Sequence, residues 1–289
     1  MATLREIRNK LHSVENIKKI TQAMEMVAGA RLRRVQTRTE NARPYMQELK
    51  LILNNLLGSS DELSHPLIQA RQEVKRIGVV IIGADKGLCG SYTNNIANKA
   101  NGFLSNYAKK DVSLYLLGHK MVSNFDKKGW DVQRKLVDWG DNITQDVVQT
   151  LSRELIESFL TGQVDEVWLV YTHFVNVMTH KVVVEKLLNI DIPPPATTEY
   201  STNYIFQPNE QEIFEAILPR YVSCKLQLAM YESFTSELAA RILAMRAATK
   251  NADEMANELT LVRNKLRQTG ITRELIEITS GAQASQSLF

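Results

Sequence analysis

The stretch that decides the fold lies between residues 217 and 259 and reads ILPRYVSCKLQLAMYESFTSELAARILAMRAATKNADEMANEL. Its apolar and small residues recur at alternating intervals of four and three, from Ile217 to Leu259. A repeat of about 3.5 residues keeps one seam of a helix facing a partner helix and predicts a left-handed coiled coil. We expect this helix to begin or kink at Pro219 and to continue through Gly270, despite the low helix propensity of glycine.

The N-terminal segment carries a similar pattern from Leu4 to about residue 57. After the first turns the spacing slips, and we expect the buried face to continue through Ile17, Ile20, Met24 and Val27. Neither helix can bury its seam alone. We therefore expect the two helices to pair antiparallel.

The residues between these helices change to a period typical of strands and helices in alternation. The sequence predicts strands at 77–82, 112–117, 132–137, 167–174 and 181–188, and helices at 91–107, 119–125 and 143–160. Such alternation implies a mainly parallel sheet with helices on its faces, and the last two strands are close enough to form a hairpin. The chain is thus predicted to have an N-terminal helix at 1–57, a Rossmann-like α/β domain at 75–190 and a C-terminal helix at 209–286. The proline-rich residues 190–208 form the connector before the last helix.

Composition excludes several classes of protein. The 289 residues are 44% hydrophobic and carry a formal charge of +3, so the chain is neither disordered nor a polybasic tail. Its two cysteines, Cys89 and Cys224, exclude a disulfide scaffold and a thiolate metal cluster. No apolar run is long enough to span a membrane, and the charged N-terminus does not resemble a signal peptide. These features predict a soluble protein from a reducing compartment.

A glycine-rich turn, GADKGLCG at residues 83–90, follows the first predicted strand. Turns in this position often bind phosphate, but a dinucleotide motif would need glycine at Asp85 and a P-loop would need Gly-Lys at residues 88 and 89. The mismatch favours a tight turn. A nucleotide-binding α/β enzyme that uses this turn remains the alternative. The histidines have no metal-ligand spacing, and Cys89 is better explained as core packing, so we expect no catalytic residue, metal or cofactor.

The first helix carries a basic cluster formed by Arg31, Arg33, Arg34 and Arg38. Nucleic acid, an anionic membrane and an acidic protein surface are all possible targets, and a solvated helix face is the plainest explanation. The arginines have no interleaved aromatic residues. An acidic protein surface is therefore at least as good a target as nucleic acid.

The two ends of the chain carry recognisable motifs. They are IRNK at 7–10, ITQAMEMVA at 20–28, DKGLCG at 85–90, SELAAR at 236–241, RQ at 267–268 and ITRELIEITSGAQA at 271–284. Together they resemble, along the whole chain, the γ subunit of rotary F-type ATP synthases in its bacterial form. Lys86 replaces an arginine usual in that family and Arg263 replaces a common aromatic residue, which affects only local contacts. The cysteine-bearing insert of chloroplast γ subunits is missing.

This resemblance implies that the paired helices form a shaft inside a ring of three α and three β subunits. The base of the shaft, together with the ε subunit, would rest on the membrane-embedded c-ring, whose proton-driven rotation changes the β subunits in sequence. It implies no catalytic chemistry and no nucleic-acid partner. It also implies an indirect, peripheral association with the cytoplasmic face of the bacterial inner membrane.

Residue roles follow from the same resemblance. Hydrogen-bonded contacts with β are expected from Arg241, Gln268 and Thr272. An acidic loop of β is expected to face Arg31, Arg33 and Arg34, with Met24 nearby. The smooth bearing at the tip would comprise Ile278, Gly281, Ala282 and Leu288, and Tyr204 is a candidate for contact with the c-ring.

Overall fold

The computed structural model describes residues 3–59, 65–69, 71, 73–191, 207 and 209–286. The chain divides into two compact units. Unit 1 comprises residues 1–27 and 242–289, and unit 2 comprises residues 28–241. Most of the predicted connector at 190–208, including Tyr204, lies outside the described residues, as does Leu288.

The elements follow the predicted order of helices and strands. They are α1 (Leu4–Ser59), β1 (Ile77–Ile82), α2 (Tyr92–Leu104), β2 (Val112–Leu117), α3 (His119–Phe125), β3 (Asp131–Leu136), α4 (Gln145–Leu160), β4 (Glu166–Phe174), β5 (His180–Leu188) and α5 (Glu210–Gln286). Three short 3₁₀ helices cover Lys109–Asp111, Asp126–Lys128 and Gly140–Asn142. The predicted combination of two long terminal helices and an α/β domain is confirmed.

Unit 2 contains a single sheet of five strands in the order β3-β2-β1-β4-β5. The first four strands are parallel, and β5 pairs antiparallel with β4, which confirms the predicted hairpin. Every residue of β1 is buried because this strand lies in the middle of the sheet with helices over both faces. At the edge of the sheet, β3 alternates exposed and half-buried residues.

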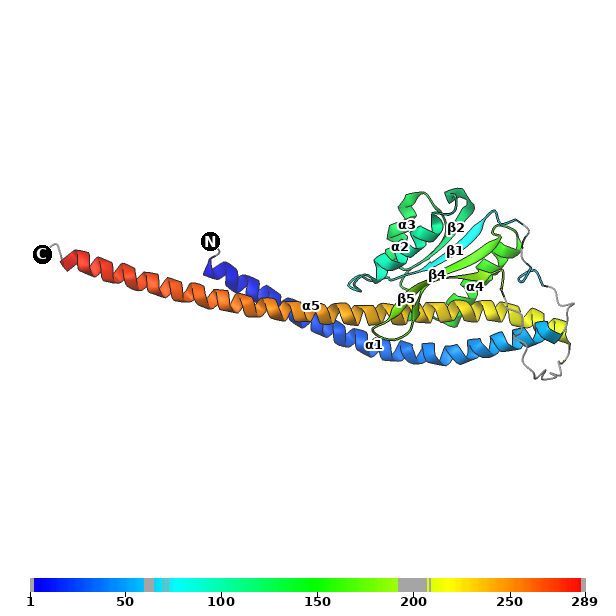
Figure 1. Ribbon diagram of the computed structural model, residues 1–289, viewed down its shortest axis with the longest axis horizontal. Coiled ribbons are helices and arrows are strands. Elements are labelled where there is room, and N and C mark those ends of the chain that lie inside the picture. The colour runs from blue at the N-terminus through cyan, green and yellow to red at the C-terminus, as the bar shows by residue number, and fades with distance from the viewer. Residues whose placement is uncertain are drawn as a thin grey trace. The chain divides into compact units, whose positions relative to one another are not determined.

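Helices cover the two faces of this sheet differently (Figure 1). On one face, Ile77, Val79 and Ile81 of β1 pack with Ile96 of α2 and Phe125 of α3. On the other face lies α4, where the hydroxyls of Tyr115 on β2 and Ser158 on α4 are 3.0 Å apart. Thr144 caps the N-terminus of α4, because its side-chain oxygen accepts a hydrogen bond from the backbone N–H of Val147.

The last helix begins at Glu210, close to the predicted bound of 209, and not at Pro219, where a start or kink was also expected. Asn209 caps α5, and its Oδ1 accepts the backbone N–H of Glu212 at 2.8 Å. The helix then continues through Pro219 and, as expected, through Gly270. A capping side chain at Asn209 thus sets the start of α5, and Pro219 lies exposed inside it.

In unit 1 the N-terminal part of α1 pairs antiparallel with α5. Lys18 pairs with Asp253, the hydroxyls of Thr21 and Thr249 are 2.7 Å apart, and Glu25 accepts from Arg246 at 2.9 Å. The partner on α5 moves toward lower numbers as the residue on α1 moves toward higher ones, which defines the antiparallel direction. The heptad of α1 therefore runs without a slip from the buried Ile7, Leu11 and Val14 through these three polar positions.

The slip predicted for α1 is accordingly wrong. Ile17, Ile20 and Val27 are 52%, 58% and 55% exposed, and Met24 is half-buried. Polar residues can occupy the seam because each finds a partner across it, so the period stays constant and the neighbouring apolar residues face outward. Unit 1 therefore presents an apolar stripe that its own helix pair does not cover.

In unit 2 the same two helices again run antiparallel. The hydroxyls of Thr39 and Thr235 are 2.9 Å apart in the buried seam, and Arg43 donates to Glu232 at 2.9 Å. The Glu232 side chain is only 3% exposed and lies 2.6 Å from the His173 ring of β4. One buried carboxylate thereby joins α1, α5 and the sheet.

Candidate partner-contact surfaces

Of the three residues predicted to hydrogen-bond with β, Arg241 lies in unit 2, and its guanidinium is occupied inside the chain. Nη2 donates to Glu237 at 2.6 Å and to the carbonyls of Lys86 and Gly87 at 3.2 and 3.3 Å. The two side chains of this ion pair are only 11% and 5% exposed. Burial raises the pKa of Glu237, and the guanidinium opposes that rise. The arginine thus ties α5 to the glycine-rich turn, and its contact with β stays a prediction.

The turn at 83–90 is itself held by an internal anion. The Asp85 carboxylate accepts the backbone N–H groups of His119, Asp138 and Trp139 at 3.0, 2.9 and 3.1 Å. These donors lie at the carboxyl ends of the parallel strands, where an α/β fold would bind a phosphate. The buried Trp139 closes the same edge and donates its indole N–H to the carbonyl of Gly83 at 3.2 Å.

This arrangement argues against the alternative of a nucleotide site at the turn. A bound phosphate would have to displace a carboxylate of its own charge from three hydrogen bonds. Position 118, where φ is 98°, has a packing reason to be glycine, because a Cβ there would lie 2.3 Å from the carbonyl oxygen of Gly83. Gly118 therefore allows the turn after β2 to pack closely on the turn at 83–90.

The basic cluster of α1 is only partly free. Arg31 forms an ion pair with Asp141 at 2.9 Å, and both side chains are about half exposed. Arg33 and Arg34 are exposed and form no ion pair within the described part of the chain. Two guanidiniums therefore remain available to an outside partner.

No described part of this chain covers the C-terminal part of α5. Every described side chain from residue 267 to residue 283 is exposed, including the predicted contact residues Gln268 and Thr272 and the tip residues Gly281 and Ala282. Within the described residues Thr272 bonds locally, donating its hydroxyl to the carbonyl of Gln268 at 3.0 Å. Among apolar residues, Ile271 is 52% exposed and Ile278 is 68% exposed.

Sequence reasoning missed the outward-facing apolar stripe of α1, formed by Ile17, Ile20 and Val27. Large apolar side chains gathered on one exposed helix face are typical of a surface that a partner covers. The signal was present, because an unbroken heptad through Lys18, Thr21 and Glu25 leaves those apolar residues outside the seam.

Among the described residues, none of the helices is both long and apolar enough to cross a membrane. The fold and these surfaces define a class of protein in which two long paired helices accompany an α/β domain and leave apolar faces exposed, as is typical of a subunit.

Comparison with known proteins identifies that class more closely. A family model described as ATP synthase matches residues 3–284. The ATP synthase gamma chain of Protochlamydia amoebophila is 48% identical over 98% of this chain and 99% of the relative. That of Cupriavidus pinatubonensis is 39% identical over 98% of this chain and the whole relative. The chain belongs to the ATP synthase gamma chain family.

Solved structures support the same fold. A chain from the mitochondrial ATP synthase of Euglena gracilis, in an OSCP/F1/c-ring structure, superposes with a TM-score of 0.69 at 19% identity. It covers 98% of this chain and 95% of its own length. A central stalk/c-ring structure from Tetrahymena thermophila gives a TM-score of 0.61 at 23% identity, covering 79% of this chain and 99% of that one.

Proposed function

We propose that this chain is the central rotor shaft of an F-type ATP synthase. Its α1 and α5 helices would transmit the proton-driven rotation of a c-ring to the catalytic β subunits. The observation that carries the proposal is the combination of a fully paired polar seam with apolar side chains left outside it. Ile17, Ile20 and Ile278, each more than half exposed, need a surrounding partner surface.

The physical role of such a shaft is to make equivalent sites unequal. Three identical α/β pairs around an axis have identical sites unless something asymmetric lies at the centre. Each orientation of the shaft contacts the three β subunits differently and so favours a different set of nucleotide affinities. The shift at any site is limited to the difference in contact free energy between that site's states.

The contact residues are assigned by this mechanism. Gln268 and Thr272 are exposed and can form hydrogen bonds with β that are made and broken during rotation. Arg241 belongs to the same proposed set, although a β contact there has to compete with Glu237 for the guanidinium.

The remaining proposed contacts are of two chemical kinds, basic and apolar. Arg33 and Arg34, with Arg31 and the half-buried Met24, suit an acidic loop of β. At the tip, Ile278, Gly281 and Ala282 offer few hydrogen-bonding groups, which suits a bearing that must slip. Leu288 is proposed for the same bearing and Tyr204 for the c-ring contact, from sequence alone.

The base of the shaft is proposed to bind ε and the c-ring and thereby to lie at the cytoplasmic face of a bacterial inner membrane without entering it. The chain itself performs no bond-making step in this proposal. The internal anion Asp85 supports that view, because the edge of the sheet where an α/β enzyme would bind a nucleotide is already filled.

The test is reconstitution with purified α and β subunits. A mixture of α and β should gain steady-state ATPase activity when this chain is added. A bead fixed to the chain should then rotate in steps during hydrolysis. Activity that is unchanged by the chain, or nucleotide turnover by the chain alone, would contradict the rotor assignment.

A further inference from the structure

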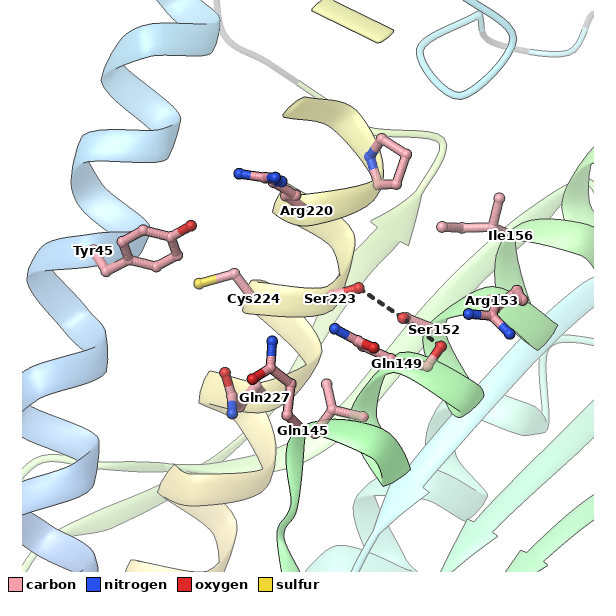
Figure 2. Close-up of a pocket in the computed structure, with 12 residues that line it drawn as sticks. Tyr45, Gln145, Gln149, Ser152, Arg153, Ile156, Arg220, Ser223, Cys224 and Gln227 are labelled. Carbon is pink, nitrogen blue, oxygen red and sulfur yellow. Dashed lines mark hydrogen bonds between the residues drawn. The ribbon is translucent and has the colours of Figure 1, made fainter. Parts of the chain in front are cut away.

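A polar groove runs between α4 and the first turns of α5 in unit 2 (Figure 2). The two helices are antiparallel along it, with Gln145 near Gln227 at one end and Ile156 toward Arg220 at the other. The groove has a volume of about 720 Å³ and is open to solvent.

A hydrogen bond between the two helices forms the floor of the groove. The hydroxyls of Ser152 on α4 and Ser223 on α5 lie 2.7 Å apart and fix the separation of the two walls. Val148 is buried beside them, and Cys224 is buried on the α5 side. Burial raises the pKa of the Cys224 thiol to about 11, so this thiol is a packing group and not a reactive one.

The lining of the groove is positively charged. Its side chains include the guanidiniums of Arg153 and Arg220, and none of the residues that line it is acidic. Both arginines are exposed, and neither forms an ion pair within the described part of the chain. A concave surface with one sign of charge concentrates ligands of the opposite charge.

The uncharged groups indicate what kind of anion belongs there. Gln145 and Gln149, one turn apart on the α4 wall, offer carboxamides that can both donate to and accept from a peptide backbone. From residue 145 to residue 156 the wall of α4 is about 16 Å long at the rise of a helix. An extended peptide of about five residues has this length.

We propose that this groove docks an extended acidic segment of a partner protein. Separate carboxylates of the segment pair with Arg153 and with Arg220, and the backbone of the segment bonds to the glutamines. Charge-assisted bonds between guanidinium and carboxylate are the strongest that this lining offers. A single small anion bound at the arginines would not contact the glutamines, which would then bond to water instead. The proposal concerns the folded chain and does not depend on rotation.

The test uses the full chain and fluorescein-labelled hexaglutamate as the probe, followed by fluorescence anisotropy. Binding should weaken by at least about tenfold in the double variant Arg153→Glu, Arg220→Glu, because both carboxylate partners become repulsive. The milder pair Arg153→Gln, Arg220→Gln should weaken it in the same direction without introducing like charges. Circular dichroism confirms that each variant is folded.

The matched control is Lys110→Glu with Lys127→Glu, which makes the same change in charge at exposed lysines outside the groove. Equal weakening by the control would show non-specific attraction and overturn the proposal. So would equally tight binding of hexaglutamine, or displacement of the probe by inorganic phosphate at lower concentration than by unlabelled hexaglutamate.

A second arm identifies the natural occupant. A photo-crosslinking residue at position 149 in the assembled complex should yield an adduct with an acidic segment of another subunit, mapped by mass spectrometry. Adducts confined to segments without acidic residues, or no adduct at all, would overturn the proposal while leaving the ATPase and rotation measurements unaffected.

Discussion

Replacing Arg241 by alanine tests how the last helix is held to the α/β domain. The substitution removes the only guanidinium that pairs with Glu237 in the described structure, together with the donor to the carbonyls of Lys86 and Gly87. Both side chains of the pair are nearly buried, at 11% and 5% exposure, so water cannot replace the lost partner without rearrangement. We expect a large loss of stability in unit 2.

The size of the loss follows from the charge left behind. Breaking a buried ion pair by removing one partner costs about 3–5 kcal/mol, mostly through the uncompensated charge. Glu237 can reduce this cost by binding a proton, because burial already raises its pKa and the guanidinium that opposes the rise is gone. The protonated form is then favoured in the folded state. The variant should therefore be closest to the parent near pH 4.5 and lose stability as the pH rises toward 8.

Urea unfolding followed by tryptophan fluorescence measures this directly. Trp130, Trp139 and Trp168 all lie between residues 28 and 241, so the signal reports on unit 2. The matched control is Arg134→Ala. This residue pairs with Glu154, and both side chains are more than a third exposed. The control should cost no more than about 1 kcal/mol, with little dependence on pH.

A second variant separates the ion pair from the packing of the arginine stem. Adding Glu237→Gln to Arg241→Ala removes the buried charge and should restore part of the stability at pH 8. The reasoning would be refuted if Arg241→Ala and Arg134→Ala lost similar free energies at pH 8, or if Glu237→Gln made the Arg241→Ala variant still less stable.

Three further outcomes are expected. Asp85→Asn replaces an acceptor of three backbone N–H groups by an amide and should cost unit 2 about 1–3 kcal/mol in urea. Burial alone would raise the pKa of Asp165, but two backbone N–H groups and the Arg71 guanidinium lower it. The folded protein therefore loses free energy of unfolding as the pH falls below about 4 and Asp165 binds a proton, and Asp165→Asn should make this loss smaller. Gln268→Ala with Thr272→Ala should lower the steady-state ATPase of the assembled complex, at about fivefold per lost hydrogen bond, with unchanged tryptophan-detected stability.

Local sequence patterns were sufficient to predict the structure wherever the burial of a residue depends on its own helix or strand alone. The run of β-branched residues in β1 can only be stable between two covered faces, and it lies in the middle of the sheet. The short separation of β4 and β5 required a hairpin. Around Gly270 the helical pattern on both sides outweighed the propensity of one residue.

Prediction failed where a seam position is polar. Apolar periodicity alone could not show that Lys18, Thr21 and Glu25 occupy the seam, because their stability there depends on partners more than 220 residues away in sequence. Periodicity also could not show the internal contacts of Arg241, whose contact with β stays a prediction. Its motif indicates an outward contact, but its observed acceptors at residues 86 and 87 are brought to it only by the folded sheet.

The polar seam and the exposed stripe have one physical explanation. A helix pair that had to be stable alone would bury Ile17 and Ile20 and leave the charged residues outside. Here Lys18–Asp253 and Glu25–Arg246 lie across the seam, where paired polar groups fix the register of two helices at some cost in stability. The apolar side chains of Ile17 and Ile20 thereby stay exposed on the outer face, where the proposed partner would cover them. A chain that must hold a fixed register while its outer surface meets successive partners benefits from this division.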